Sequence, residues 1–185
     1  LDLNPESVPR GTSFVDIATG SGIPGMIIAI GNPSVQGTLI DSNSKKIAFI
    51  QELAQKLELT NVRAVCARAE DFCKEYTEQF DYSFTRAFGP VYYSIEFSMP
   101  VLKMGGLLHI FSRRNAGDLS DDMLQHLKDC GGACLCEGSV DIKNMFNDNN
   151  RGICLVKVFQ TPSKYPRRFP VIKREAARIP EFKEG

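Results

Sequence analysis

Apolar and polar residues alternate along the chain with two different periods, and these periods predict strands and helices in turn. Short apolar runs that end at glycine or polar residues predict strands at 13–18, 36–42, 61–67, 80–86 and 105–113. Between them, helical spacing or composition predicts helices at 24–31, 44–59, 91–102 and 120–130, and a polar helix or turn at 69–79. This alternation is typical of a doubly wound α/β sheet with parallel strands.

The last part of the chain departs from this alternation. Two further strands are predicted at 133–142 and 151–161 with no helix between them, so a hairpin is the simplest connection and the final pair is expected to be antiparallel. We therefore predict an α/β, Rossmann-like fold with a mostly parallel seven-stranded sheet and an antiparallel end. One domain is expected over residues 1–160, followed by a basic tail over 161–185 that lies over the surface.

Local signals refine three boundaries. Ser44 is the predicted N-cap of the second helix, and Pro100 is expected to break the helix at 91–102. The chain begins at Leu1 without an initiator methionine and enters its first strand almost at once. We therefore expect that an N-terminal segment precedes this sequence.

Composition adds few constraints. The 185 residues are 43% hydrophobic and 24% charged, with 22 basic and 22 acidic residues. No apolar run approaches the roughly 18 residues of a membrane span, and no signal peptide is evident, so we expect a cytoplasmic protein without a membrane partner. We also expect a monomer. The charge is uneven: residues 161–185 carry seven lysines and arginines against three glutamates. This excess indicates either an anionic partner or a solvated terminus.

The six cysteines are expected to be free thiols. Cys130, Cys134 and Cys136 cluster, but they lack the paired spacing and the nearby histidines of a zinc site. We therefore predict no metal.

The stretch DIATGSGIPG begins with Asp16 inside the first predicted strand and carries Gly20, Gly22 and Gly25 at the spacing of a nucleotide-binding loop. In a sheet of this kind, ligands bind beyond the carboxyl ends of the strands. Asp41 ends the second strand, where a carboxylate accepts hydrogen bonds from ribose hydroxyls. Both nicotinamide dinucleotides and S-adenosylmethionine contain such a ribose, so Asp41 does not distinguish them.

Asp16 favours S-adenosylmethionine. It lies four residues before Gly20, where a carboxylate would repel a pyrophosphate but attract a sulfonium and an α-ammonium group. The antiparallel end and the lack of room for a separate catalytic domain also fit a methyltransferase better than a dehydrogenase. We therefore predict S-adenosylmethionine as the cofactor.

The methyl acceptor is less constrained. The stretch TRAFGP at 85–90 has no polar clamp for an exocyclic amine, and no cysteine between Cys73 and Cys130 offers the nucleophile that attack at a pyrimidine carbon needs. A ring nitrogen such as guanine N7 carries no proton and needs only positioning. Arg68 and Arg86 follow strand ends, as candidates for catalysis or as members of surface ion pairs. Phe88 either stacks on a base or packs in the core.

Four stretches together resemble the bacterial small-subunit ribosomal RNA methyltransferases of the RsmG family, also called glucose-inhibited division protein B. These stretches are FVDIATGSGIPG, TLIDSNSKKIAFIQELAQKLELTNV, ARAEDF and FDYSFTRAF, and the tail TPSKYPRR is similar to the family's closing segment. The resemblance implies methylation at N7 of guanine 527, in bacterial numbering, of 16S RNA. It also implies an N-terminal helical segment, which this sequence lacks.

The resemblance also implies site residues. The predicted cofactor contacts, including those argued from the loop itself, are Asp16, Ala18, Gly20, Gly22, Ile23, Asp41, Ser42, Ala69, Glu70 and Arg86. Arg68 and Arg86 are the predicted catalytic residues. The predicted contacts to 16S RNA or the small ribosomal subunit are Lys45, Phe88, Lys164, Arg167 and Arg168. Two departures from the family pattern are Ala18, where glycine is commoner, and the sequence FPVIKREAARIP after YPRR.

Three alternative functions stay open at this point. The zero net charge suggests a methyltransferase that acts on a small molecule, and another RNA site is a further alternative substrate. A chain without its N-terminal segment could bind the cofactor without catalysis. A nicotinamide enzyme is the third alternative, which Asp16 disfavours.

Overall fold

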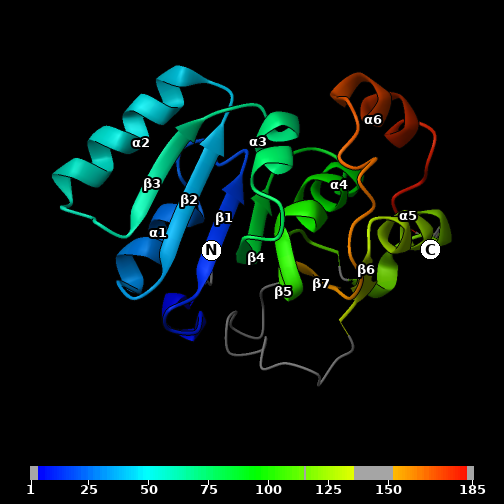
Figure 1. Cartoon of the computed structure of the whole chain (residues 1–185), viewed down its shortest axis with the longest axis horizontal. Coiled ribbons are helices and arrows are strands. Elements are labelled where there is room, and N and C mark those ends of the chain that lie inside the picture. The colour runs from blue at the N-terminus through cyan, green and yellow to red at the C-terminus, as the bar shows by residue number, and fades with distance from the viewer. Residues whose placement is uncertain (1–3, 115, 136–151, 183–185) are drawn as a thin grey trace.

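The chain folds around a single seven-stranded sheet. The computed structural model describes residues 4–114, 116–135 and 152–182. The strands lie in the order β3-β2-β1-β4-β5-β7-β6, and within the described residues β7 runs in the opposite direction to the other strands (Figure 1). Their bounds are β1 (Ser13–Ile17), β2 (Gln36–Asp41), β3 (Val62–Cys66), β4 (Phe80–Arg86), β5 (Leu102–Phe111), β6 (Gly132–Cys134) and β7 (Gly152–Lys157). The predicted α/β fold with an antiparallel end is confirmed.

Helices cover the sheet on two sides. One hydrophobic cluster joins the sheet to α1 (Gly25–Gly31) and α2 (Ser44–Lys56). The other joins it to the remaining helices, which are α3 (Ala69–Glu75), α4 (Val91–Val101), α5 (Asp121–Asp129) and α6 (Phe169–Ala176). Two short 3-10 turns, η1 (Pro5–Ser7) and η2 (Ala116–Asp118), complete the described elements.

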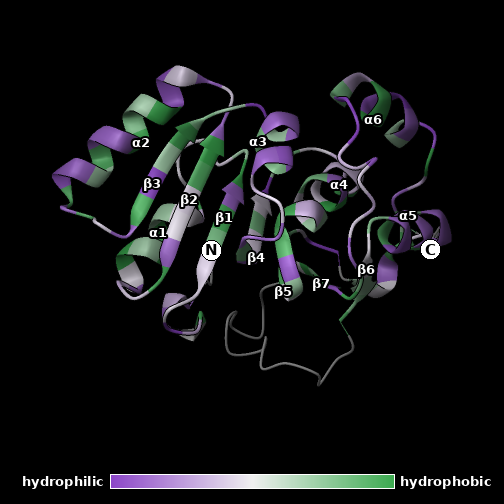
Figure 2. Ribbon diagram, in the orientation of Figure 1, coloured by the Kyte–Doolittle hydropathy of each residue, from purple (hydrophilic) through white to green (hydrophobic). Residues whose placement is uncertain are grey.

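The strand sequences explain why both faces are covered. Phe14 and Leu39 belong to the cluster under α1 and α2, whereas Val15, Ile17 and Ile40 belong to the opposite cluster. Apolar residues on both faces of a strand are the signature of a parallel sheet buried on each side. Helix α2 buries Ile47 and Ile50 and leaves Phe49 exposed, and Figure 2 shows hydrophobic and hydrophilic residues alternating along it.

The structure corrects the predicted cap of α2. Asn43, not Ser44, is the N-cap: its backbone is extended, and its side-chain oxygen accepts hydrogen bonds from the backbone N–H groups of Lys45 and Lys46 at 3.0 and 3.4 Å. Ser44 is the first helical residue. The helix ends at Lys56, three residues before the predicted end, because Glu58 adopts a left-handed conformation with φ of 53°.

Other predicted boundaries shift near the end of the chain. Pro100 does not break α4, because it lies in the last turn and the helix continues to Val101. Strand β7 ends at Lys157 instead of residue 161. Strand β6 ends at Cys134, and residues 136–151, which include the rest of the predicted strand and the predicted hairpin loop, lie outside the described residues.

The segment after residue 160 is anchored in the core instead of only lying over the surface. Tyr165, Ile172 and Ala176 are buried members of the larger hydrophobic cluster. Helix α6 packs against α4, as Figure 1 also shows. Among the described residues, no helix is long and apolar enough to cross a membrane.

Candidate active site at the carboxyl edge of the sheet

The carboxyl ends of the four parallel strands β1 to β4 meet at one edge of the sheet (Figure 1). Every predicted cofactor contact lies in these strands near that edge or in the segments that follow them: Asp16, Ala18, Gly20, Gly22 and Ile23 from β1 and its loop, Asp41 and Ser42 from β2, Ala69 and Glu70 at the start of α3, and Arg86 at the end of β4. The topology therefore brings together residues up to 70 positions apart in sequence. This edge is where open α/β sheets bind ligands.

The loop after β1 needs glycine for two different reasons. Gly20 and Gly22 have φ values of 63° and 91°, a left-handed conformation that is open to glycine without strain. Gly25 begins α1, and a Cβ atom there would lie 2.8 Å from Leu39 Cγ and 2.9 Å from Asp16 Oδ2. The third glycine therefore lets the helix pack closely on the sheet. Ala18 also has a positive φ, of 57°, which explains why glycine is commoner at its position.

The side chain of Asp16 holds this loop in place through two hydrogen bonds. Its Oδ2 atom accepts hydrogen bonds from Thr19 Oγ1 at 2.7 Å and from the backbone N–H of Gly25 at 2.9 Å. Its Oδ1 atom is buried and has no hydrogen-bond partner within the described structure. Burial raises the pKa of the carboxyl group to about 7, against the lowering effect of the two hydrogen bonds and of Arg86.

Asp41 joins the loops that follow β1 and β2. Its Oδ2 atom accepts from the backbone N–H of Gly20 at 3.0 Å, and its Oδ1 atom accepts from that of Asn43 at 2.9 Å. Lys46 lies 3.5 Å from the same carboxylate. Because a carboxylate has about four acceptor positions, each oxygen can still accept a hydroxyl donor. Ser42, the next residue, is exposed.

The rim of the site carries unpaired cations. Arg68, Arg86 and Lys45 are exposed, and no carboxylate among the described residues lies within salt-bridge distance of any of them. Ala69 and Glu70 are half-buried in the first turn of α3. These cations are therefore available to a negatively charged ligand.

The structure separates the other predicted RNA contacts. Phe88 is half-buried and its ring packs against Phe97 and Tyr93, with centroid distances of 5.7 and 6.2 Å, which favours the core interpretation. Lys164 and Arg168 are exposed. Arg167 instead points inward, so its predicted place among the RNA contacts does not match its geometry.

Arg167 forms an internal network that the sequence analysis missed. Its Nε atom donates to Glu96 Oε1 at 2.9 Å, one Nη atom donates to Glu96 Oε2 at 2.6 Å, and the other contacts Glu175. Glu96 is completely buried in α4. Tyr92 accepts from Arg167 at 2.8 Å. The available signal was a single glutamate inside the apolar stretch VYYSIEFSMPVL, since a buried charge requires a partner.

The described residues contain no group of three histidine, cysteine, aspartate or glutamate side chains that could hold a metal ion. Cys130 is buried and Cys134 is half-buried, and neither forms a disulfide with another described residue. Cys136, the third member of the predicted cluster, lies outside the described residues.

The residues at the carboxyl edge fit S-adenosylmethionine. The unpartnered Oδ1 of Asp16 is suited to a cationic group, and Asp41 is suited to ribose hydroxyls. The sheet order with antiparallel β7, together with this glycine loop, is that of a class I S-adenosylmethionine-dependent methyltransferase.

Solved structures with little sequence similarity share the fold. A chain of the Haloferax volcanii complex that contains the Trm112 methyltransferase activator matches with a TM-score of 0.60 and 12% identity, over 83% of this chain and 85% of that chain. The cyclase SpnF matches with a TM-score of 0.56 and 21% identity, over 70% of this chain and 53% of that chain. Because a cyclase has the same fold, the fold alone does not define the reaction.

Sequence relatives define the family. The family model described as rRNA small subunit methyltransferase G matches residues 4–127. Ribosomal RNA small subunit methyltransferase G of Mycoplasmoides gallisepticum is 38% identical, over 90% of this chain and 68% of that protein, and that of Trichormus variabilis is 34% identical, over 86% and 66%. The chain belongs to the family of ribosomal RNA small subunit methyltransferase G, and it spans about two thirds of the length of these relatives.

Proposed function

We propose that this chain transfers a methyl group from S-adenosylmethionine to N7 of a guanine in 16S ribosomal RNA, guanine 527 in bacterial numbering. Membership of the family supports the RNA substrate. The observation that carries the proposal is the carboxyl edge itself, where a glycine loop, two acidic strand ends and two unpaired arginines converge.

The cofactor supplies an electrophilic methyl group, and the residues of the edge hold it. Asp41 accepts hydrogen bonds from the ribose hydroxyls while it keeps the loop in place through Gly20. The loop from Ala18 to Ile23 lies against the methionine part, whose α-ammonium group is attracted by Asp16. Ala69 is small enough to lie against the adenine, and Glu70 accepts a hydrogen bond from its amino group.

The acceptor nitrogen requires positioning and no base. Guanine N7 has a free lone pair and no proton to remove, so catalysis comes from orientation for an in-line displacement. Arg68 and Arg86 supply two unpaired guanidinium groups beside the site. We propose that they orient the RNA by its phosphates, with Arg86 also within reach of the cofactor carboxylate. Lys45, Lys164 and Arg168 provide further exposed cations.

One alternative is a methyltransferase that acts on a small molecule or at another RNA site. The zero net charge favours a small-molecule substrate, since most RNA-binding proteins carry a basic surface. The unpaired arginines at the rim favour RNA instead.

Methyl incorporation from labelled S-adenosylmethionine tests the proposal. The substrates are 16S RNA and small ribosomal subunits from cells that lack the modification. We expect transfer to at least one of them, and at least tenfold less transfer by Asp41→Ala, because a charged hydrogen-bond acceptor contributes about 1.5–3 kcal/mol.

Glu52→Gln is the matched control. This exposed glutamate in α2 pairs with Lys56 and lies outside the candidate site, so its loss should leave transfer unchanged. Binding of S-adenosylhomocysteine, measured separately, distinguishes a failed cofactor site from a failed substrate assignment. Incorporation into a small molecule and into neither RNA substrate would contradict the proposal.

A further inference from the structure

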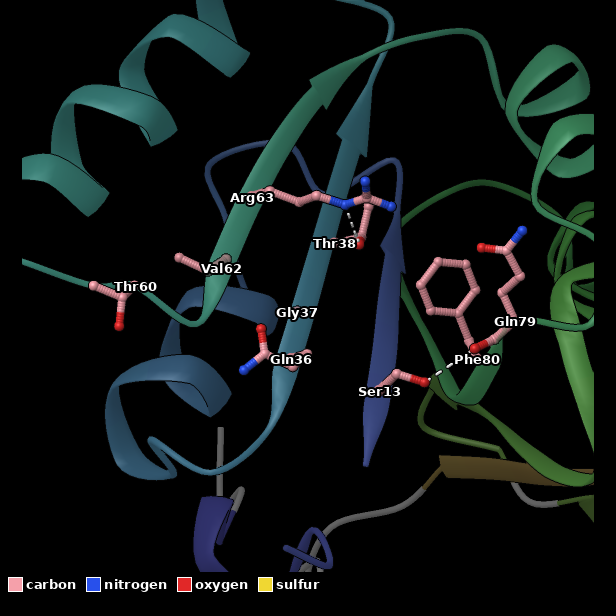
Figure 3. Close-up of a pocket in the computed structure, with 9 residues that line it drawn as sticks. All are labelled: Ser13, Gln36, Gly37, Thr38, Thr60, Val62, Arg63, Gln79 and Phe80. Atoms are coloured by element: carbon pink, nitrogen blue, oxygen red, sulfur yellow. Dashed lines mark hydrogen bonds between the residues drawn. The ribbon is translucent and has the colours of Figure 1, made fainter. Parts of the chain in front are cut away.

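A hollow lies at the opposite edge of the sheet from the candidate active site. Its volume is about 380 Å³, and it is lined by residues at or next to the amino ends of β1, β2, β3 and β4 (Figure 3). None of the residues assigned above to cofactor or RNA lines it. The volume is within the range of small-ligand sites.

Arg63 is an exposed residue that lines this hollow, and its side chain makes two contacts there. Its Nε atom donates to Thr38 Oγ1 at 2.9 Å, and its guanidinium carbon lies 5.1 Å from the centroid of the Tyr76 ring. Figure 3 shows the side chain reaching across β2, so that the terminal nitrogens lie over the sheet on the side of β1. A guanidinium group held in this way loses little further entropy when it binds a ligand.

The charge of Arg63 is not neutralised by a neighbour. None of the salt bridges among the described residues includes it, in contrast to Arg167, which pairs with two glutamates. Asp81 lies near the rim, but it is bonded to Lys103 at 2.8 Å and to Ser13. Within the described part of the chain, no carboxylate therefore lies within salt-bridge distance of the two terminal nitrogens of Arg63.

The rest of the lining suits a polar ligand. Gln36, Thr60 and Gln79 contribute neutral amide and hydroxyl groups from different parts of the lining, and the ring of Phe80 lies beside Gln79 (Figure 3). None of the described residues that line the hollow is acidic. A preorganised cation with neutral hydrogen-bonding neighbours is a receptor for an oxyanion, and a guanidinium fork matches phosphate best.

We propose that this hollow binds a phosphate group, carried by a free mononucleotide or by a nucleotide of RNA, with Arg63 as its bidentate contact. The site is separate from methyl transfer and does not depend on the proposed function.

Titration of the ¹⁵N-labelled 185-residue chain tests this site. The probes are uridine 5′-monophosphate and uridine, and the readouts are the Arg63 Nε–Hε signal and the backbone amide of Val62. We expect saturable shifts with the monophosphate and none with uridine. Arg63→Gln should weaken binding of the monophosphate at least about tenfold, because a charged hydrogen bond is lost. Arg63→Lys should bind with intermediate affinity, because the charge stays but the fork is lost.

Arg10→Gln is the matched control, since Arg10 is exposed and does not line the hollow. Thr38→Val removes the acceptor for the Nε–H group of Arg63 and should also weaken binding of the monophosphate. It replaces Arg63→Gln in the test if that variant does not fold. A 16S RNA fragment identifies the source of the phosphate: reduced RNA affinity of Arg63→Gln indicates RNA, and unchanged RNA affinity with reduced monophosphate affinity indicates a free nucleotide. Equal binding of uridine, no saturable shift, or an unchanged Kd in Arg63→Gln would each overturn the proposal.

Discussion

At the scale of single residues, Asp16 makes stability depend on pH in an unusual direction. Burial raises its pKa in the folded protein from 3.8 to about 7, so the folded state holds a proton that the unfolded state has released between these values. The contribution of Asp16 to the free energy of unfolding is therefore fully present below about pH 4 and is lost as the pH rises through 7. The free energy of unfolding changes by at most about 1.4 kcal/mol per pH unit.

Asp16→Asn removes this titration. Its carbonyl oxygen can still accept from Thr19 and Gly25, so we expect the variant to gain stability relative to the parent as the pH rises from 5 to 8. Urea unfolding at each pH measures the difference. Parallel stability curves for the two proteins would show that Asp16 is already ionised when folded.

At the scale of elements, the start of α2 depends on one side chain. Asn43→Ala removes the acceptor for the first backbone N–H groups of the helix and should cost about 1 kcal/mol of unfolding free energy. Ser44→Ala changes a residue that is already helical and should stay within about 0.5 kcal/mol. Chemical denaturation compares the two, and a larger loss in Ser44→Ala would contradict the observed cap.

The anchoring of α6 on α4 depends on Arg167. Arg167→Ala leaves Glu96 buried without its main cation, so we expect a loss of about 3 kcal/mol. His126 does not replace that cation at neutral pH, since burial lowers its pKa to about 4.

The neighbouring Arg168→Ala is the control for this prediction. Arg168 is exposed, so its loss should leave stability within about 0.5 kcal/mol and lower only the affinity for RNA. Denaturation curves and RNA binding are measured on both variants. Equal stability of the two would indicate that the network with Glu96 contributes nothing to the anchoring of α6.

At the scale of the whole molecule, the sequence predicted the sheet because strands and helices have different hydrophobic periods. Alternating strands and helices then predict parallel strands joined by helical crossovers. The positions of the glycine loop and of Asp41 were predictable because both follow directly from the ends of predicted strands. Glycine spacing marks the loop after the first strand, and Asp41 ends the second strand. Arg167 was not: its basic neighbours suggested RNA, and only the fold brings it to Glu96, 71 residues away. Asp16 was placed correctly in the first strand, but its burial and its contacts with the loop depend on how α1 packs.

The most direct test of the central claim is to identify the methylated atom. Small ribosomal subunits that lack the modification are incubated with the protein and labelled S-adenosylmethionine, and the RNA is digested to nucleosides for mass spectrometry. The account predicts that the label appears in 7-methylguanosine derived from a single position of 16S RNA. Label in any other nucleoside, with the cofactor product still bound at the carboxyl edge, would contradict it.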